Sequence, residues 1–283
     1  MAAVPRDTRR VAPLRGQDRT VKTMERAPLD LPRLQDALAP RWARIEVVER
    51  TASTNADLLA DSAAPDRSVL AAEDQVAGRG RLDRVWTSPP RAGLTFSALL
   101  RPPVPIPVWG WLPLLAGVAL HEAVDATAGI ETTVKWPNDL LAADGRKLAG
   151  ILAQTSGAAV VIGIGLNVDS APDELPVDSA TSLLLAGAPG LDRTALLAAI
   201  LTRLDARYAQ WADCGGDAAA SGLTAAYRSA CSTLGRPVRV ALGDDTVVAG
   251  HASDIDVLGR LVVRTADGER SIGAGDVEHV RPA

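Results

Sequence analysis

The stretch Gly78–Trp86 most constrains what this chain can fold into. It carries two glycines and three arginines, and it lies between two apolar runs, Val69–Glu73 and Leu94–Leu100, that are predicted to be buried strands. Glycine lets backbone N–H groups come close to a ligand, and guanidinium groups are planar, permanently charged donors suited to phosphate and carboxylate. The stretch is therefore either a solvated turn or a loop that folds over an anion, and a short motif alone does not distinguish the two.

The rest of the chain alternates between helical periodicity and short apolar runs. Helices are predicted at Leu31–Leu38, Val108–Ala128, Asp192–Trp211 and Asp217–Cys231. Further strands are predicted at Arg44–Glu49, Thr132–Trp136 and Val160–Gly165, with a hairpin formed by Asp139–Ala142 and Arg146–Gln154. Together they predict an α+β fold with a mixed, largely antiparallel sheet flanked by helices.

The residue pattern changes beyond Gly235, where short runs of residues that favour β-strands alternate with turns containing Gly and Asp. These runs are Pro237–Leu242, Thr246–Ile255, Leu258–Thr265 and Glu269–Ile272. The pattern is typical of a small β-barrel. We therefore predict a disordered leader over residues 1–28, a main domain over 29–232 and a small barrel over 233–283.

Composition excludes several classes of protein. The 283 residues carry a formal net charge of −4, which gives no global attraction to nucleic acid or anionic lipid. No apolar run approaches the roughly 18 residues of a membrane span, and no signal peptide is evident, so a cytoplasmic protein is predicted. Cys214, Cys231 and the scattered histidines fit no metal or disulfide spacing, so no metal site is predicted.

The leader is rich in Arg, Pro and Thr and has almost no apolar periodicity, which predicts disorder. Its basic residues also fit a nucleic-acid-binding arm, although 28 residues are too few for a helix-turn-helix domain. The simpler alternative is an unstructured tail without a function, or a translation start that is really at Met24.

Three further polar stretches carry candidate ligand-binding residues. In Thr51–Leu59, Ser53 or Thr54 is placed to cap a helix, and the alternative is that these hydroxyls bind a neutral polar ligand. Lys135–Leu140 and Lys147–Leu152 bring charges to a predicted hairpin, where an ion pair at the sheet edge is the simpler interpretation. Gly163–Asn167 is too short for a dinucleotide-binding fingerprint and lacks the helix that should follow.

In their order and spacing these motifs resemble the biotin protein ligase family. The matching motifs are Gly-Arg-Gly-Arg-x-x-Arg-x-Trp from Gly78, Lys-Trp-Pro-Asn-Asp from Lys135, Lys-Leu-Ala-Gly-Ile-Leu from Lys147 and Gly-Ile-Gly-Leu-Asn from Gly163, with Ser53-Thr54-Asn55 and Gln75 before them. The resemblance covers roughly residues 45–280. It implies a class II synthetase-like catalytic domain followed by an SH3-like barrel, in the form of the family without an N-terminal DNA-binding domain.

The resemblance implies a reaction in two steps. The biotin carboxylate attacks the α-phosphorus of ATP and gives biotinyl-5′-AMP and pyrophosphate. A lysine on the carboxyl-carrier domain of a biotin-dependent carboxylase, such as acetyl- or acyl-CoA carboxylase or pyruvate carboxylase, then attacks the activated carbonyl. Mg²⁺ would arrive on ATP, held mainly by phosphates and water. No DNA or membrane partner is expected, and the protein would be a monomer or a weak homodimer.

The resemblance also assigns roles to residues. Arg79, Arg81 and Lys147 would offset the repulsion between carboxylate and phosphate, and Asp139 would orient the incoming amine or accept its proton. The implied biotin contacts are Ser53, Thr54, Asn55, Gln75, Arg79, Gly80, Arg81 and Lys147. The implied ATP contacts are Gly78, Arg79, Arg81, Trp86, Lys135, Asn138, Lys147 and Asn167, with adenine stacked on Trp86. Asp83 departs from the family pattern by placing a carboxylate in the arginine loop, and it is expected to face solvent.

Three rival functions stay open from the sequence. A lipoate ligase shares the fold family and the adenylate chemistry, although a Ser-Thr-Gln pocket suits the ureido ring of biotin better than lipoate. A biotin-responsive DNA regulator would use the basic leader and bind an operator with a steep salt dependence. A binding module without catalysis would keep its activity unchanged when Lys147 is replaced by alanine.

Overall fold

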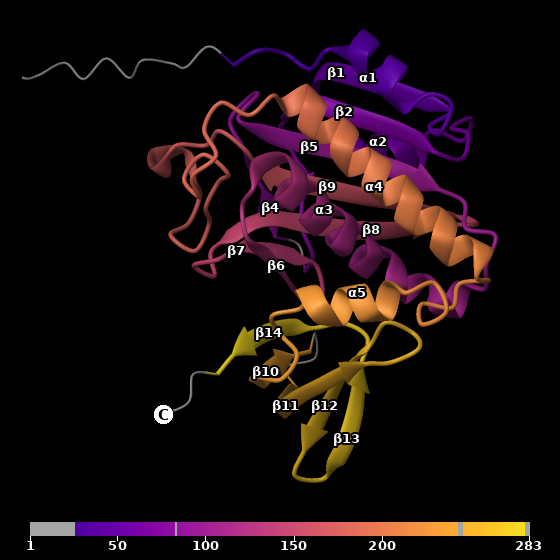
Figure 1. Cartoon of the computed structure of the whole chain (residues 1–283), viewed down its shortest axis with the longest axis vertical. Helices are drawn as coiled ribbons and strands as arrows, with labels where there is room; N and C mark the ends of the chain where they lie inside the picture. The colour runs from indigo at the N-terminus through magenta and orange to yellow at the C-terminus, as the bar shows by residue number, and fades with distance from the viewer. Residues whose placement is uncertain (1–25, 83, 243–245, 281–283) are drawn as a thin grey trace, which may run out of the picture.

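The computed structural model describes residues 26–82, 84–242 and 246–280. A seven-stranded sheet with helices on both faces is followed by a five-stranded antiparallel sheet (Figure 1). The predicted fold class is confirmed. The helices are α1 (Leu31–Leu38), α2 (Thr54–Ala60), α3 (Leu112–Ala128), α4 (Arg193–Asp213) and α5 (Leu223–Ala230), with short 3₁₀ helices η1 (Ile106–Trp111) and η2 (Pro172–Glu174).

The large sheet is antiparallel except at one edge. Its strands are β1 (Arg44–Thr51), β2 (Ser68–Gln75), β5 (Gly93–Leu100), β6 (Thr132–Lys135), β7 (Asp139–Ala142), β8 (Lys147–Ser156) and β9 (Ala159–Asn167), in the order β1-β2-β5-β9-β8-β7-β6. Only β1 and β2 run parallel. β9 lies in the middle and is almost wholly buried, as expected for a strand that is apolar along its length and covered on both faces.

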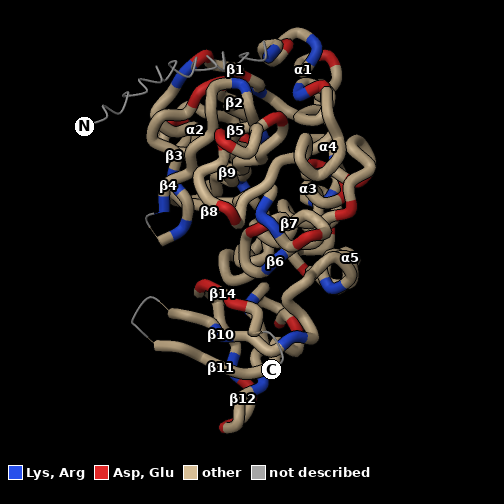
Figure 2. The backbone as a smooth tube through the Cα atoms, turned by 90° about the vertical axis from the view of Figure 1, so that its left-hand side faces the viewer, with Lys and Arg blue, Asp and Glu red and all other residues tan. Residues whose placement is uncertain are grey.

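The helices divide between the two faces of this sheet. α3 is apolar and almost wholly buried from Leu112 to Leu120, where α4 and the sheet cover it, with Leu112, Leu115 and Leu120 fully buried. Figure 2 shows α1, α3 and α4 on one face, while α2 and the short strands β3 (Gly78–Arg79) and β4 (Val85–Trp86) lie on the other.

The five-stranded sheet consists of β10 (Pro237–Ala241), β11 (Val247–Ile255), β12 (Leu261–Thr265), β13 (Gly268–Ile272) and β14 (Asp276–His279). It is fastened to the rest of the chain through the turn between β11 and β12. Trp111 donates its indole N–H to the Val257 carbonyl at 3.1 Å. Beside it, a Cβ on Gly110 would lie 2.4 Å from the Leu258 carbonyl oxygen, so the close approach requires glycine.

Several predicted boundaries are wrong. The helix predicted at Asp217–Cys231 begins only at Leu223, because Gly222 adopts a left-handed conformation (φ +74°) that interrupts it. The helix predicted from Val108 starts as a 3₁₀ helix and becomes α-helical at Leu112. Strand β14 was not predicted.

The last residues of the predicted leader, 26–28, belong to the described part of the chain. Residues 1–25 lie outside the described part of the chain, as does Asp83. Arg26, however, is bonded to Glu174 and to the Asp169 carbonyl, and the Ala27 carbonyl accepts a bond from Arg193 at 2.7 Å. Among the described residues, no helix combines the length and the hydropathy that a membrane crossing requires.

Candidate active site

A cavity of about 800 Å³ opens on the sheet face that carries α2 and the arginine loop. It brings together segments from most of the chain. The predicted site residues that line it are Ser53, Thr54, Asn55, Gln75, Arg79, Gly80, Arg81, Trp86, Lys135, Asn138, Asp139, Lys147 and Asn167. Gly78 is the exception: it is buried, and a Cβ there would lie 2.4 Å from both the Gln75 amide nitrogen and the Trp86 carbonyl.

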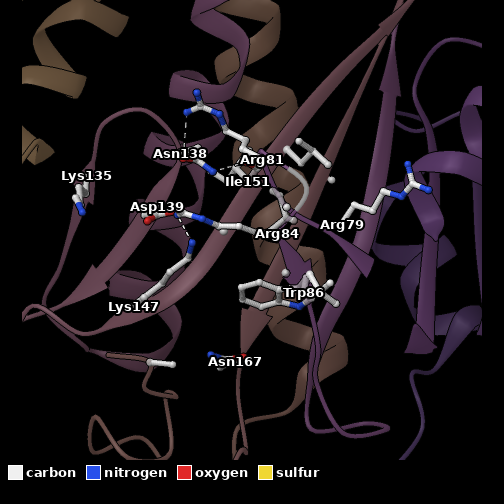
Figure 3. A pocket seen from close by; sticks show the side chains of 18 of the residues that line it. Arg79, Arg81, Arg84, Trp86, Lys135, Asn138, Asp139, Lys147, Ile151 and Asn167 are labelled. Atoms are coloured by element: carbon white, nitrogen blue, oxygen red, sulfur yellow. Dashed lines mark hydrogen bonds and ion pairs between the residues drawn. The ribbon is translucent and has the colours of Figure 1, made fainter. Parts of the chain in front are cut away.

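Lys147 points into this cavity because of a β-bulge. Leu140 pairs with Ala149, but the next residue, Leu141, pairs with Lys147, so two residues of β8 oppose one of β7. The extra residue turns Lys147 to the same face as Asp139, since side chains otherwise alternate along a strand. The Lys147 ammonium lies 2.6 Å from the Asp139 carboxylate (Figure 3). The predicted ion pair is present, and it lies inside the cavity.

The arginines of the loop do not all point the same way. Arg81 reaches the side-chain oxygen of Asn138 at 3.5 Å, whereas Arg79 is exposed and directed away from Lys147 and Asp139 (Figure 3). Burial lowers the pKa of Arg81, and the negative charges of Asp276 and Asp139 oppose that change. Arg81 is thus turned toward Asn138, the neighbour of Asp139, and lines the cavity.

Asn138 is fixed by the neighbouring strand. Its amide nitrogen donates to the Ile151 carbonyl at 2.9 Å, and its own carbonyl accepts from the Ile151 N–H at 2.9 Å. Only the side-chain oxygen faces Arg81. The residue therefore holds the Lys135–Asp139 turn against β8 while presenting one acceptor to the loop.

Glycines form the floor beneath Trp86. Gly150 and Gly165 are paired residues of β8 and β9, and a Cβ on either would come within 3.4 Å of the Trp86 indole. The Lys147 ammonium lies 6.0 Å from the centre of the indole ring. The two glycines leave room for the flat indole ring against the sheet, with a cation close by. Such a surface could also accommodate a planar ligand group.

The opposite end of the cavity is polar and uncharged. Ser53 caps α2 by accepting from the Ala56 N–H at 3.4 Å, so the capping interpretation is confirmed. The next residue, Thr54, shares a 2.7 Å bond between its hydroxyl and that of Ser97. The Gln75 side-chain oxygen accepts from the Thr54 N–H at 2.9 Å. These groups offer donors and acceptors to a ligand without any net charge.

Asn55 extends this network toward β8. Its amide nitrogen donates to the Gln154 side chain at 2.8 Å, and its oxygen accepts from Ser97 at 2.5 Å. A Cβ on Gly163 would lie 2.2 Å from the Asn55 oxygen, so this glycine makes room for the amide. Ser97 and Gln154 were not singled out in the sequence, because neither lies in a recognisable motif.

Asn167 lines the cavity and also braces a neighbouring loop. The residue is buried, with only 4% of its surface exposed. Its amide nitrogen donates to the Thr181 carbonyl at 2.9 Å. The Ser179 carbonyl accepts from the Lys147 N–H, and the Thr181 N–H donates to the Lys147 carbonyl, both at 2.8 Å. The loop over 179–181 thus adds a strand-like edge beside Lys147 and is held there by Asn167.

The site can be compared with known proteins. The sequence profile of the Biotin/lipoate A/B protein ligase family matches residues 45–169, and that of the Biotin protein ligase C terminal domain matches residues 233–280. The Biotin--[acetyl-CoA-carboxylase] ligase of Mycobacterium tuberculosis is 43% identical over 266 residues, which cover 90% of this chain and 97% of that protein. The chain belongs to the biotin protein ligase family.

Other members of the biotin protein ligase family resemble the chain at lower identity. The Bifunctional ligase/repressor BirA of Bacillus spizizenii is 36% identical and is matched over 82% of this chain and 72% of that protein. The solved structure of a biotin protein ligase from Aquifex aeolicus in complex with biotin and ATP superposes with a TM-score of 0.73 at 27% identity, covering 85% of this chain and all of that one.

Sequence reasoning missed the contribution of β14 to this cavity. Asp276, Val277, Glu278 and His279 all line the cavity. The segment contains a single apolar residue, Val277, which is too little of a pattern to predict a strand. Nothing in the sequence indicates that it lies beside the arginine loop, 192 residues earlier.

His279 is the least expected member of the cavity lining. Burial, together with the positive charges of Lys135 and Arg236, lowers the pKa of His279 to about 4. Its ring nitrogen lies 3.2 Å from the Thr233 hydroxyl, which also accepts from the Trp136 N–H at 3.1 Å. His279 is therefore neutral near pH 7 and ties β14 to the Lys135–Asp139 turn.

Proposed function

We propose that the protein is an ATP-dependent biotin protein ligase. In the first step a biotin carboxylate oxygen forms a bond to the α-phosphorus of ATP, and pyrophosphate leaves with the electrons of the broken bond. In the second step the amine of an acceptor lysine attacks the biotinyl carbonyl, giving an amide and AMP. Family membership supports this reaction, and so does the geometry of the cavity.

The observation that carries the proposal is the division of one cavity into a neutral polar end and a cationic end. Thr54, Asn55 and Gln75 provide uncharged donors and acceptors that suit a ureido ring. Arg81 and Lys147 lie toward the other end, where a carboxylate and a phosphate would have to meet. A biotin molecule extended between the two ends would meet suitable partners along its length.

Fixed cations are what the first step requires. Two anions repel each other, and negative charge builds on the phosphoryl oxygens in the transition state. Lys147 is held by the bulge and by Asp139, so its charge is in place before the ligand arrives. Arg79 points away in this structure, and we propose that it turns inward when the loop closes over the adenylate.

The remaining roles follow from the surroundings of each residue. We propose that adenine stacks on Trp86, above the glycine floor, with Lys135 and Asn138 near the phosphates. Asn167 would act on the nucleotide through the loop it holds, since its amide nitrogen is already bonded. Asp139 would receive the ammonium proton of the acceptor lysine or orient its amine, because it lies beside Lys147 at the cavity surface.

Mg²⁺ would enter as part of the substrate MgATP. Across the described residues, no group of three or more His, Cys, Asp and Glu side chains is arranged to hold a metal ion. Phosphates and water usually supply most ligands of a nucleotide-bound Mg²⁺, so the donor set of the cavity is compatible with this form of the metal.

The acceptor proteins, the cellular location, the oligomeric state and the domain boundaries are also part of the proposal. The acceptors would be the carboxyl-carrier domains of acetyl- or acyl-CoA carboxylase and of pyruvate carboxylase, and the protein would work in the cytoplasm without DNA, as a monomer or weak homodimer. Residues 29–232 would form the catalytic domain and 233–283 the smaller C-terminal domain, with the rest a leader.

The direct test is mass spectrometry of a purified carboxyl-carrier domain after incubation with the protein, ATP and either biotin or lipoate. We expect a mass increase of one biotinyl group, confined to the target lysine and dependent on ATP. A carrier domain in which that lysine is replaced by arginine is the matched control. Transfer of lipoate in place of biotin, or labelling of the control domain, would contradict the proposal.

A further inference from the structure

Strand β14 brings a carboxylate to the arginine loop. Asp276, the first residue of β14, forms an ion pair with Arg84, and both side chains line the cavity. The Arg84 side chain is 67% exposed and that of Asp276 31% exposed, so the pair lies at the rim of the cavity. It joins the catalytic part of the chain to the C-terminal sheet.

The position of Asp276 is fixed by its strand. Asp276 and Val277 pair with Ala241 and Val240 of β10, and Val277 is only 4% exposed. At the other end of β14, His279 is linked through Thr233 to the backbone of Trp136. The carboxylate is thus attached to a rigid support that is itself joined to the Lys135–Asp139 turn.

The loop, in contrast, has few attachments of its own. Gly80 donates its N–H to the Arg84 carbonyl, and Gly78 pairs with Trp86 in the two-residue strands. Leu82 and Val85 expose 56% and 72% of their surface, so little apolar burial holds this segment down. Among the described residues of the loop tip, the side chains that bond to the rest of the protein are Arg81, to Asn138, and Arg84, to Asp276.

Asp276 also interacts electrostatically with Arg81, the second arginine of the loop. Its negative charge favours the charged form of Arg81 more strongly than Asp139 does, against the effect of burial. The same carboxylate therefore pairs with Arg84 and attracts Arg81 toward the cavity.

We propose that Asp276 is a positioning residue that holds the arginine loop over the cavity through Arg84. The inference rests on the proposed function for its catalytic consequence: a loop held in this way slows the escape of biotinyl-adenylate and the entry of water. Asp276 does not take part in bond formation. The C-terminal sheet thereby acts as a support for the loop.

The first test needs no ligand. Trypsin cleaves after arginine, so the rate of cleavage after Arg79 and Arg81, identified by mass spectrometry, reports how often the loop opens. We expect Asp276→Asn to accelerate this cleavage about two- to fivefold, which is the range for loss of an exposed ion pair. The double variant Arg84→Asp with Asp276→Arg, which reverses the pair, should bring the rate back toward that of the wild type.

The matched control is Asp254→Asn. Asp254 lies in β11 and pairs with Arg228 of α5, with side chains 41% and 50% exposed, so it also links the C-terminal sheet to the catalytic part. It does not line the cavity. Its loss should leave loop cleavage unchanged. Equal cleavage in Asp276→Asn and Asp254→Asn would overturn the proposal.

The second test measures escape of the intermediate. The protein is loaded with biotin and ATP without an acceptor, and the appearance of free AMP is followed. Asp276→Asn should release AMP about two- to fivefold faster than the wild type or Asp254→Asn, with a smaller change in the rate of adenylate formation. Unchanged AMP release would also overturn the proposal. A wild-type protein that forms no biotinyl-adenylate would instead contradict the proposed function, and the trypsin comparison would still decide whether Asp276 holds the loop.

Discussion

The indole of Trp86 lies directly over Gly165. A Cβ at position 165 would be 2.3 Å from the ring, much closer than any carbon atom tolerates. Gly165 belongs to the central strand β9, whose backbone is held on both sides by β5 and β8. The strand cannot move aside, so the indole must.

We therefore expect Gly165→Ala to displace Trp86 and weaken the nucleotide end of the site. Overpacking of this kind costs about 1–3 kcal/mol, which corresponds to roughly a 5- to 150-fold loss in kcat/KM for ATP. Steady-state kinetics with the carrier domain would measure it. Gly273→Ala is the control, because a Cβ there meets only the flexible Arg260 side chain at 3.8 Å. Equal kinetics for both variants would contradict the stacking role.

Ser97 connects the two polar residues at the other end of the cavity. Its hydroxyl lies 2.7 Å from that of Thr54 and 2.5 Å from the Asn55 oxygen, and the residue is fully buried. Ser97→Ala removes the donor to the buried Asn55 oxygen, while the Thr54 hydroxyl keeps its bond to the Gln75 side-chain oxygen at 3.2 Å. The free energy of unfolding should therefore fall by about 1–3 kcal/mol. The KM for biotin should rise more than kcat falls. In Ser253→Ala, which removes a single bond to the Val262 carbonyl, the KM should stay unchanged.

The depressed pKa of His279 predicts a loss of stability in mild acid. Below its ordinary pKa of 6.5 the unfolded chain takes up a proton on this ring, whereas the folded protein does so only near pH 4. The unfolded state therefore binds more protons between these values, and stability falls as the pH falls. Between pH 7 and pH 5 the wild type should lose about 1–2 kcal/mol more than His279→Asn.

Urea unfolding at both pH values would test this difference. His251→Asn, which alters an exposed histidine of the same sheet, is the matched control for loss of a histidine. A wild type whose stability changes no more than that of His279→Asn would show that His279 is protonated as easily in the folded protein as in the unfolded chain.

Arg26 holds the loop that carries part of the cavity wall. Its guanidinium binds both oxygens of Glu174, at 2.6 and 3.1 Å, and donates to the Asp169 carbonyl at 2.8 Å. Val177 and Ser179, a few residues on, line the cavity. Glu174→Gln should lower stability by about 1 kcal/mol and raise the KM for ATP, while Asp173→Asn, which leaves the Arg26 pair intact, should do neither.

The Arg26–Glu174 pair also has a predicted pH dependence. The hydrogen bond from Arg26 lowers the pKa of Glu174 below 4.5, so the folded state keeps the carboxylate charged where the unfolded chain begins to protonate. Its contribution to stability is complete above the unfolded pKa and is lost as the pH falls through the lower, folded pKa. The difference in stability between wild type and Glu174→Gln should therefore shrink below about pH 4.

Much of the fold follows from the sequence, because its strands are apolar, short and bounded by clear breaks. The central strand, predicted at Val160–Gly165, occurs at Ala159–Asn167. The helix predicted at Asp217–Cys231 begins only at Leu223, for a reason that periodicity does not reveal, since Gly222 takes a left-handed conformation. Local pattern identifies an element more reliably than its ends.

The candidate site was predictable where its residues lie in motifs, and not where tertiary contacts create it. Lys147 and Asp139 were both singled out, but the bulge that turns Lys147 toward Asp139 depends on how β7 and β8 pair. Ser97 lies in an unremarkable apolar strand. Asp276 reaches the arginine loop only because the C-terminal sheet packs beside the Lys135–Asp139 turn, which no spacing along the chain encodes.

The central claim is that cations from remote parts of the chain meet at one cavity to join a carboxylate to a nucleotide. The most direct measurement is the exchange of labelled pyrophosphate into ATP, with and without biotin and without any acceptor. Exchange should require biotin, and Lys147→Gln should reduce it about 10²- to 10³-fold. Arg146→Gln, which removes an exposed ion pair with Asp144 in the adjacent turn, should stay within about twofold of the wild type. Exchange at the wild-type rate in Lys147→Gln, or exchange without biotin, would contradict the account.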